Sequence, residues 1–295
     1  MEKEEKPKGI IVGPLIKLAS LPKEGWAGWI VLVGIIIVLS MVIITIIGPF
    51  ISPYDPNAFH TGPLFAPPSS EHLFGTNHLG QDMLSRVLCG GTTMLQVALL
   101  SVTICFIIGV PIGLFSSYIG GNLDKVISLV MDSIYAFPGL VLAIAIAVML
   151  GKGAVNMALS IAVIYIPSYF RIVRSQVLTI KEMAYVEAAK AIGARNRTIL
   201  VRYILPNVIP SIVTVATINF ADAILTAAGL TFLGWGVEVD IPDWGWDLYY
   251  GRQYISKAWW IIFFPGLMII LLALGFTFIG EGLSELLNPR LREGK

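Results

Sequence analysis

Two acidic residues lie inside long apolar stretches of this sequence, where an ionised side chain is expensive to bury. Asp132 falls within 126–150 and Asp222 within 208–233. Buried acids of this kind are functional candidates by default, and a proton relay would use such residues. Asp132 is close in sequence to Lys125 and falls at the end of its stretch that faces a basic segment, so structural ion pairing is favoured for it. Asp222 lies nearer the middle of its stretch, and either a pore-facing or a helix-bridging role stays open.

The histidines and cysteines predict no metal or redox centre. His60, His72 and His78 share one polar segment, but their spacing matches no dedicated ligand pattern, so we expect solvent-exposed loop histidines. Cys89 and Cys105 lack a paired C-x-x-C spacing. The motifs H-E-x-x-H and G-x-S-x-G do not occur either. We therefore expect no catalytic residue and no metal site in this chain.

The composition places the chain in a membrane. Of its 295 residues, 56% are hydrophobic and 13% are charged, whereas a soluble domain carries about 25% charged residues. This excludes a soluble single-domain enzyme, and a net charge of +1 gives no nucleic-acid footprint. Stretches of about 20 apolar residues are long enough to span a bilayer. Scanning with that length predicts an all-α protein with six spans, at 29–47, 95–118, 126–150, 155–170, 208–233 and 259–279.

The distribution of cations predicts the orientation. Sixteen of the 20 Lys and Arg residues fall on one side of the six-span pattern. Because cytoplasmic segments are enriched in these residues, both termini are predicted to be cytoplasmic. Seven of the cations lie between the fourth and fifth spans: Arg171, Arg174, Lys181, Lys190, Arg195, Arg197 and Arg202. Five tryptophans near the last outer loop are expected to act as interfacial anchors: Trp235, Trp244, Trp246, Trp259 and Trp260.

The segment between the fourth and fifth spans has the pattern of a helix, a turn and a second helix. Residues 175–192 are good helix formers without Gly or Pro, and Gly193 follows where a left-handed cap would fall. A second short helix over 195–205 is expected to stop at Pro206, just as Pro167 is expected to break the fourth span. Small side chains around Ala188 permit close approach by another surface. Docking of a cytoplasmic partner and contact with anionic lipid headgroups both stay open.

Two further features leave alternatives open. Gly109 and Gly113 have the Gly-x-x-x-Gly spacing of close helix packing, either within this chain or against another subunit. The last outer loop carries four acids that could receive a protein partner or merely lie at the interface: Glu238, Asp240, Asp243 and Asp247.

The string EAAKAIGARNRTILVRYILPN at 187–207 resembles the EAA loop of the membrane permease subunits of type I ABC importers. Three more stretches resemble the C-type subunit of the dipeptide, oligopeptide and nickel branch of that family: FGTNHLGQDMLSR at 74–86, and the segments 108–138 and 230–252. The ending Asn288-Pro289-Arg290-Leu291-Arg292 resembles it too. The chain departs from the common pattern of these relatives at Asn77 and Gln81, where Asp and Arg are usual, and at Ala227, where many carry Glu.

The resemblance implies a permease fold with a cytoplasmic coupling helix between helices 4 and 5. It implies docking on an ATPase by Glu187, Ala188, Ala189 and Gly193, with Ile204, Leu205 and Pro206 returning the chain to the membrane. The implied partners are a second, B-type permease subunit, two cytoplasmic ABC ATPases that carry ATP and Mg, and an extracytoplasmic solute-binding protein. The chain itself would bind no cofactor and would not be an enzyme, since Gly151-Lys152-Gly153 lacks the flanking residues of a phosphate-binding loop.

The resemblance also divides the chain. A cytoplasmic segment is expected at 1–26, a first helix with an extracytoplasmic loop at 27–90, a permease core at 91–284 and a cytoplasmic tail at 285–295. The implied function is half of the translocation path for dipeptides or oligopeptides in an inner or plasma membrane. Import of oligosaccharides or nickel is the alternative within this class. An ion-coupled secondary transporter that uses Asp222 and Asp132 is the alternative outside it.

Overall fold

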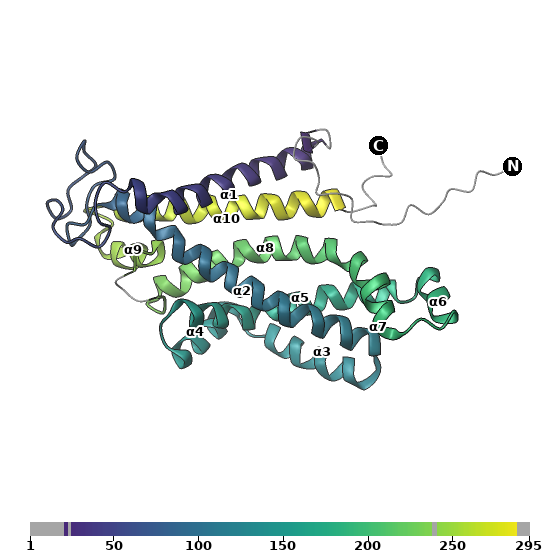
Figure 1. Ribbon diagram of the computed structural model, residues 1–295. Coiled ribbons are helices and arrows are strands. Elements are labelled where there is room, and N and C mark those ends of the chain that lie inside the picture. The colour runs from purple at the N-terminus through teal and green to yellow at the C-terminus, as the bar shows by residue number, and fades with distance from the viewer. Residues whose placement is uncertain (1–20, 23–24, 238–240, 288–295) are drawn as a thin grey trace.

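The chain folds into a bundle of helices that is elongated along one axis (Figure 1). The computed structural model describes residues 21–22, 25–237 and 241–287, so most of the predicted N-terminal segment and the ending at 288–292 lie outside the described residues. Five segments are long and apolar enough to cross a membrane: α1 (Trp26–Ile51), α2 (Met83–Ile119), α5 (Ala154–Ile180), Asn196–Phe232 and α10 (Trp260–Leu287). A bent pair, α3 (Gly121–Tyr135) with α4 (Gly139–Leu150), supplies a sixth. The prediction of an all-α, six-span protein is confirmed.

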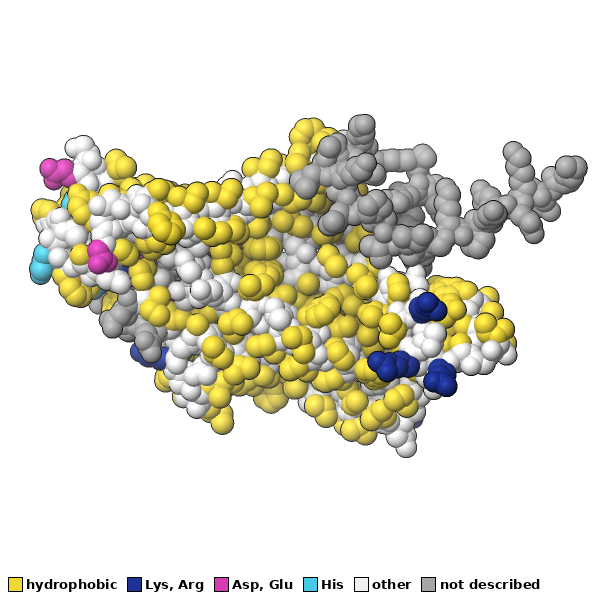
Figure 2. Space-filling view, in the orientation of Figure 1, with side chains coloured by type: hydrophobic (Ala, Val, Ile, Leu, Met, Phe, Trp, Pro, Cys, Tyr) yellow, Lys and Arg dark blue, Asp and Glu magenta, His cyan; other side chains and the backbone are white. Residues whose placement is uncertain are grey.

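The first and last spans pack against each other in opposite directions (Figure 1). Ala27 and Val31, near the start of α1, cluster with Leu286, near the end of α10. The beginning of the first span and the end of the last therefore lie at the same end of the bundle, as an even number of crossings requires. Figure 2 shows hydrophobic side chains over most of the bundle's surface, with most of the visible Lys and Arg at one end and the visible Asp, Glu and His at the other.

The third span is not the straight helix that we predicted over 126–150. The chain breaks at 136–138, and the axes of α3 and α4 differ by 91°. Pro138 is the N-cap of α4, and a proline disfavours helical backbone in the residue before it. Pro138 therefore ends α3 and allows the chain to turn.

Pro167, by contrast, does not break the fourth span. Helix α5 continues through it to Ile180, so the expected span 155–170 was too short. A proline is tolerated inside a membrane helix where neighbouring helices hold the segment, and Pro167 is buried between its neighbours. The residues 175–180 that we assigned to a separate cytoplasmic helix are the end of α5.

Pro206 does not stop a helix either. The chain passes from α7 (Asn196–Thr198) through a π-helical turn, η2 (Ile199–Ile204), directly into α8 (Leu205–Phe232). Pro206 falls in the first turn of α8, where a missing backbone N–H costs little. The wider π-helical turn before it leaves room for the proline ring, so the expected second helix and the fifth span are one continuous segment.

Helices α2 and α5 approach each other closely through glycine. A Cβ atom on Gly109 would lie 2.7 Å from the Cβ of Tyr169, and one on Gly113 would lie 2.9 Å from the Cβ of Val173. Both distances are too short for any side chain, so the backbones meet only because these two residues have none. The Gly-x-x-x-Gly spacing therefore serves packing within this chain.

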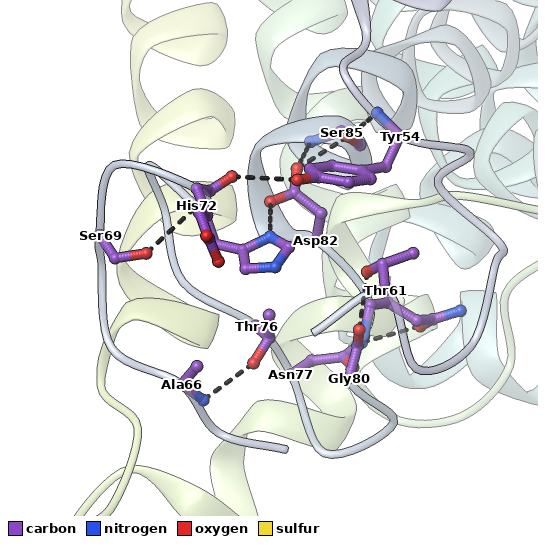
Figure 3. Close-up of polar contacts among 12 residues, drawn as sticks. Tyr54, Thr61, Ala66, Ser69, His72, Thr76, Asn77, Gly80, Asp82 and Ser85 are labelled. Carbon is purple, nitrogen blue, oxygen red and sulfur yellow. Dashed lines mark hydrogen bonds and ion pairs between the residues drawn. The ribbon is translucent and has the colours of Figure 1, made fainter. Parts of the chain in front are cut away.

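The loop between α1 and α2 is tied together by hydrogen bonds (Figure 3). His72 Nδ1 lies 2.9 Å from Asp82 Oδ1, and the other oxygen of Asp82 accepts from the backbone N–H and the hydroxyl of Ser85 at the start of α2. The expectation of exposed histidines was wrong for His72, which is 3% exposed. Asn77 donates to Gln81 at 2.8 Å, so the two departures from the family pattern contact each other as a neutral pair.

The loop between α8 and α10 folds back into the bundle as α9 (Trp244–Gly251) followed by η3 (Arg252–Tyr254). Trp244, Trp246 and Trp260 are buried, and each indole N–H donates to a backbone carbonyl, so the prediction of interfacial anchors was wrong for these three. Asp243 and Asp247 are buried too and offer no surface to a partner, whereas Glu238 and Asp240 lie outside the described residues. Arg86 on α2 donates to Asp247 at 2.6 Å, which links α2 to α9.

Gly109→Ala should destabilise the protein by about 1–3 kcal/mol, because the new methyl group meets the α5 backbone. Gly266→Ala in α10 is the matched control, since a Cβ there would lie 3.7 Å from its nearest neighbour. Alanine at that site should be neutral or slightly stabilising. Thermal unfolding in detergent measures both variants, and equal behaviour of the two would contradict the close α2–α5 contact.

Asp243 predicts a pH dependence of stability. Burial raises its pKa to about 7, and one of its oxygens caps α9 while the other has no hydrogen-bond partner. The folded protein therefore holds a proton that the unfolded chain releases, so stability falls as the pH rises from about 4 to about 7. In Asp243→Asn, which keeps the cap but cannot ionise, the midpoint of thermal unfolding should fall by several degrees less over that range. Asp243→Ala loses the cap as well, so it should be about 1 kcal/mol less stable than Asp243→Asn at every pH.

Candidate functional site

A short helix, α6 (Ala184–Ala191), extends beyond the end of the bundle between α5 and α7 (Figure 1). It is shorter than the predicted helix over 175–192, because the chain turns at residues 181–183 after α5 ends. Met183 has extended backbone angles and precedes the first turn of α6. The turn contains neither Gly nor Pro, so the local sequence does not predict a break in the helix here.

One face of α6 is packed into the bundle. Val186 is fully buried and Ala189 is 3% exposed, and both belong to an apolar cluster that contains Ile199 of η2 and Val177 of α5. Ala189 therefore supports α6 from within and offers little surface to a partner, contrary to the role that the family resemblance implied for it. Ile204 is likewise fully buried.

The opposite face of α6 is free and largely apolar. Glu187 and Ala188 are exposed there, and Gly193 is exposed just beyond the helix. Three larger apolar side chains surround them, with exposed fractions of 42% for Met183, 41% for Tyr185 and 82% for Ile192. An exposed apolar patch with a polar rim is typical of a protein-binding surface. We call this face, formed by Met183, Tyr185, Glu187, Ala188, Ile192 and Gly193, the outer face of α6.

Gly193 ends α6 in the conformation that the sequence predicts. Its φ is +81°, in the left-handed region that favours glycine. Its N–H donates to the carbonyl of Lys190, and the N–H of Ala194 donates to the carbonyl of Ala189, which is a Schellman motif. A Cβ on Gly193 would meet nothing within 4 Å. Glycine is therefore required at position 193 for its backbone conformation and not for lack of space. The surface around it is open to a partner.

Helix α6 is held to the bundle from three sides. It follows α5 directly, and the Lys181 side chain in the turn between them donates to the Ser117 carbonyl of α2 at 3.1 Å. The Tyr118 hydroxyl of α2 donates to Asn196 of α7 at 3.0 Å, and Asn207 of α8 donates to the Tyr185 hydroxyl at 3.2 Å. A force applied to α6 therefore reaches α2, α5 and α8 together.

Two arginines of α5 bind the two acids of α3. Arg174 makes a forked pair with Asp124, in which its Nε and terminal nitrogen lie 2.7–3.1 Å from the carboxylate oxygens. Arg171 donates to Asp132 at 2.7 Å and stacks over the ring of Tyr135. The cation beside Asp132 is thus Arg171 of the basic segment and not Lys125. Each forked or stacked arginine fixes the position of α3 against α5.

Asp222 lies in a different environment. It lines a cavity of about 280 Å³ between α5, α8 and the bend that joins α3 to α4. Tyr165 and Ser168 of α5 and Asn219 and Thr226 of α8 line the same cavity. The Tyr165 and Thr226 hydroxyls lie 2.9 Å apart and are hydrogen-bonded. The structure therefore separates the two predicted acids, since Asp132 is in an ion pair and Asp222 faces open space.

The other polar residues of this cavity are not predicted from the sequence. Asn219, Asp222 and Thr226 are spaced by three and four residues, which places them on one face of a helix. That spacing is visible in the sequence, but Tyr165 and Ser168, which line the same cavity, lie on another helix. Only the fold brings the two sets together.

Comparison with known proteins places these features in a family. The family described as "Binding-protein-dependent transport system inner membrane component" matches residues 109–293. That described as "N-terminal TM domain of oligopeptide transport permease C" matches residues 29–69. The first of these regions contains α6 and every residue named for the cavity.

Three relatives align over most of their length. A dipeptide transport system permease protein from Alkalihalophilus pseudofirmus is 39% identical over 88% of this chain and 86% of its own. A probable D,D-dipeptide transport system permease protein from Escherichia coli is 37% identical over 86% of each chain. A glutathione transport system permease protein from Pectobacterium atrosepticum is 37% identical over 86% of this chain and 85% of its own.

A solved structure shares the fold. A chain of an inward-facing methionine ABC transporter superposes with a TM-score of 0.55 at 20% identity, covering 68% of this chain and 94% of that one. At this identity the likeness concerns the arrangement of helices alone.

Gly193→Ala should weaken the end of α6 by about 1 kcal/mol, because alanine is disfavoured at positive φ. Gly193→Asn should cost less, since asparagine tolerates this conformation. Hydrogen exchange of the α6 amides measures the effect directly: exchange should be fastest in the alanine variant and intermediate in the asparagine variant. Equal exchange in all three proteins would contradict the assigned cap.

Proposed function

The chain belongs to the family of inner membrane components of binding-protein-dependent transport systems, and from this premise we propose that it forms half of the translocation path of an ATP-driven peptide importer. It is a multi-pass membrane transport subunit rather than an enzyme. The permeases that it is similar to are named for dipeptides, D,D-dipeptides and glutathione, which are all short peptides. This agreement among the relatives supports a short peptide as the transported molecule here, ahead of oligosaccharides or nickel.

The proposed partners on the cytoplasmic side are two ABC ATPases, which bind ATP and Mg. The exposed apolar outer face of α6 supports this assignment, because a soluble partner would bury Ile192 and its neighbours. The sequence lacks a phosphate-binding loop of its own. A second permease subunit would complete the path, and an extracytoplasmic binding protein would deliver the peptide.

The proposed orientation has α6 and both termini in the cytoplasm. Lys190, Arg195 and Arg197 lie on or beside α6, and Lys and Arg gather at this end of the bundle (Figure 2). Cations in short segments favour the cytoplasmic side. The end with the His72 loop and α9 would then face outward and meet the binding protein.

The packing of α6 suggests how the partner's motion would reach the membrane. Val186 and Ala189 are buried against η2 and α5, so α6 cannot move far without moving them. Helix α5 carries Arg171 and Arg174, which bind α3, and Tyr165 and Ser168, which line the cavity. A rigid displacement of α6 would thus change the shape of the cavity some helical turns away.

The overall proposal is tested by purification and transport. The chain expressed with its neighbouring transport genes should copurify with a second permease and with ATPase subunits, and the reconstituted complex should import a dipeptide only when ATP and a binding protein are present. Peptide or proton-coupled transport by the purified chain alone would refute the proposal and favour an ion-coupled transporter that uses Asp222.

Ala188→Asp should abolish ATPase association and uptake, because it puts a charge in the middle of the apolar outer face of α6. Residue 188 is exposed, so the folded permease should still insert and unfold at the wild-type temperature. Pull-down of the ATPases and uptake of radiolabelled dipeptide are the measurements. Glu182→Gln, an exposed substitution in the turn before α6, is the control and should behave as wild type. Normal uptake by Ala188→Asp would refute the docking surface.

A further inference from the structure

The cavity between α5, α8 and the α3–α4 bend has an unusual balance of charge. Its polar lining consists of hydroxyls and one amide, from Tyr165, Ser168, Asn219, Thr226 and Tyr135, together with the carboxylate of Asp222. No Lys, Arg or His is among its lining residues. Asp222 makes no ion pair or hydrogen bond within the described part of the chain, whereas Asp124 and Asp132 are both bound to arginine. The cavity therefore has one acid and no cation to neutralise it.

Asn219, which lines the same cavity, has an unsatisfied hydrogen-bond donor. Asn219 is 6% exposed, and its amide nitrogen is buried without a hydrogen-bond partner among the described residues, near the equally unpartnered hydroxyl of Tyr169. A buried donor without a partner costs about 1–3 kcal/mol, so such groups normally meet a ligand, a water or another chain. Asn219 lies one helical turn before Asp222 on the same face of α8. Asp222 thus presents an anion to the cavity, and Asn219 beside it carries a donor that must turn from its buried position to reach a molecule there.

We propose that Asn219 and Asp222 form a transient binding site for the amino-terminal end of the transported peptide. Asp222 would bind the α-ammonium group, and the amide of Asn219 would donate to the first peptide carbonyl, which follows that ammonium along the chain. The inference rests on the proposed function and adds to it a requirement for a free amino terminus within the membrane domain itself.

The surroundings fit this assignment better than they fit a metal ion or a sugar. One carboxylate with hydroxyls and an amide lacks the several oxygen or nitrogen ligands that a cation site collects. A neutral sugar would leave the charge of Asp222 unbalanced. A volume of about 280 Å³ is at the small end for ligand sites, which suits the end of a peptide. Apolar neighbours such as Ile134, Phe137 and Leu140 would accept its first side chain.

The test measures peptide binding by the permease–ATPase complex without the binding protein, because the binding protein's own preference among peptides would mask that of the permease. Radiolabelled alanyl-alanine binds to the complex in nanodiscs, and N-acetyl-alanyl-alanine serves as competitor. We expect the acetylated peptide to compete poorly. Asp222→Asn should weaken binding about tenfold or more, as expected for loss of a charged hydrogen bond, and Asn219→Leu should weaken it several-fold. Asp222→Glu should restore most of the affinity.

Glu182→Gln is the matched control, since it removes an equal charge from an exposed residue in the turn before α6, away from the cavity lining. It should leave alanyl-alanine binding within about twofold of wild type. Three outcomes would overturn the inference while the proposed function stands. The acetylated peptide could compete as well as the free one, or Asp222→Asn could bind like wild type. A complex that still imports the peptide could also show no saturable binding at millimolar peptide. Loss of the second permease from the Asp222→Asn complex would also overturn it, because Asp222 would then pair with that subunit. Failure of the wild-type chain to assemble or import would overturn both.

Discussion

The close approach of α2 to α5 is the constraint on which the rest of the structure depends. Gly109 and Gly113 let the two backbones meet, and α5 carries nearly everything that the function uses. The middle of α5 lines the cavity with Tyr165 and Ser168. The part nearer α6 contacts α3 through Arg171 and Arg174, and the end of α5 leads into α6. A shift of α5 relative to α2 would therefore disturb the cavity, α3 and the outer face of α6 together. Hydrocarbon offers no hydrophobic force between helices, so close packing of this kind must provide the attachment.

Some charged side chains of this chain form ion pairs between helices, and others in the part that the structure describes are exposed without one. The seven cations between the fourth and fifth spans were counted as one loop, but Arg171 and Arg174 lie on α5 and are bound to acids of α3. The remaining ones surround α6. The acids differ in the same way, because Asp124, Asp132 and Asp247 have arginine partners, whereas Asp222 has none in the described part of the chain. An unpaired acid in a polar cavity is the exception among them, and for that reason it is the best candidate for contact with a passing molecule.

Much of the fold could be predicted from the sequence because a bilayer imposes a simple rule: long apolar runs must become helices. Three of the failures in the predicted helix bounds involve a proline, whose effect on a helix has several possible outcomes. Pro138 ends one helix and begins another, Pro167 lies inside a continuous helix, and Pro206 sits harmlessly in a first turn. The same residue type has three effects because the outcome depends on what packs around the freed carbonyl and the ring.

The class of protein, the number of spans, the cap at Gly193 and the family can all be read from the amino-acid sequence. They follow from the length of the apolar runs, the distribution of charge, the backbone preference of glycine and a contiguous motif. Helix packing, by contrast, places Ala189 inward and Ala188 outward, buries His72 together with Asp82, and brings Asn77 and Gln81 into one pair. It alone joined Tyr165 and Ser168 to Asn219 and Asp222 around one cavity. Residues that are some 50 positions apart meet only when two helices pack, and the rotation of each helix is set by the neighbours that it packs against rather than by its own sequence.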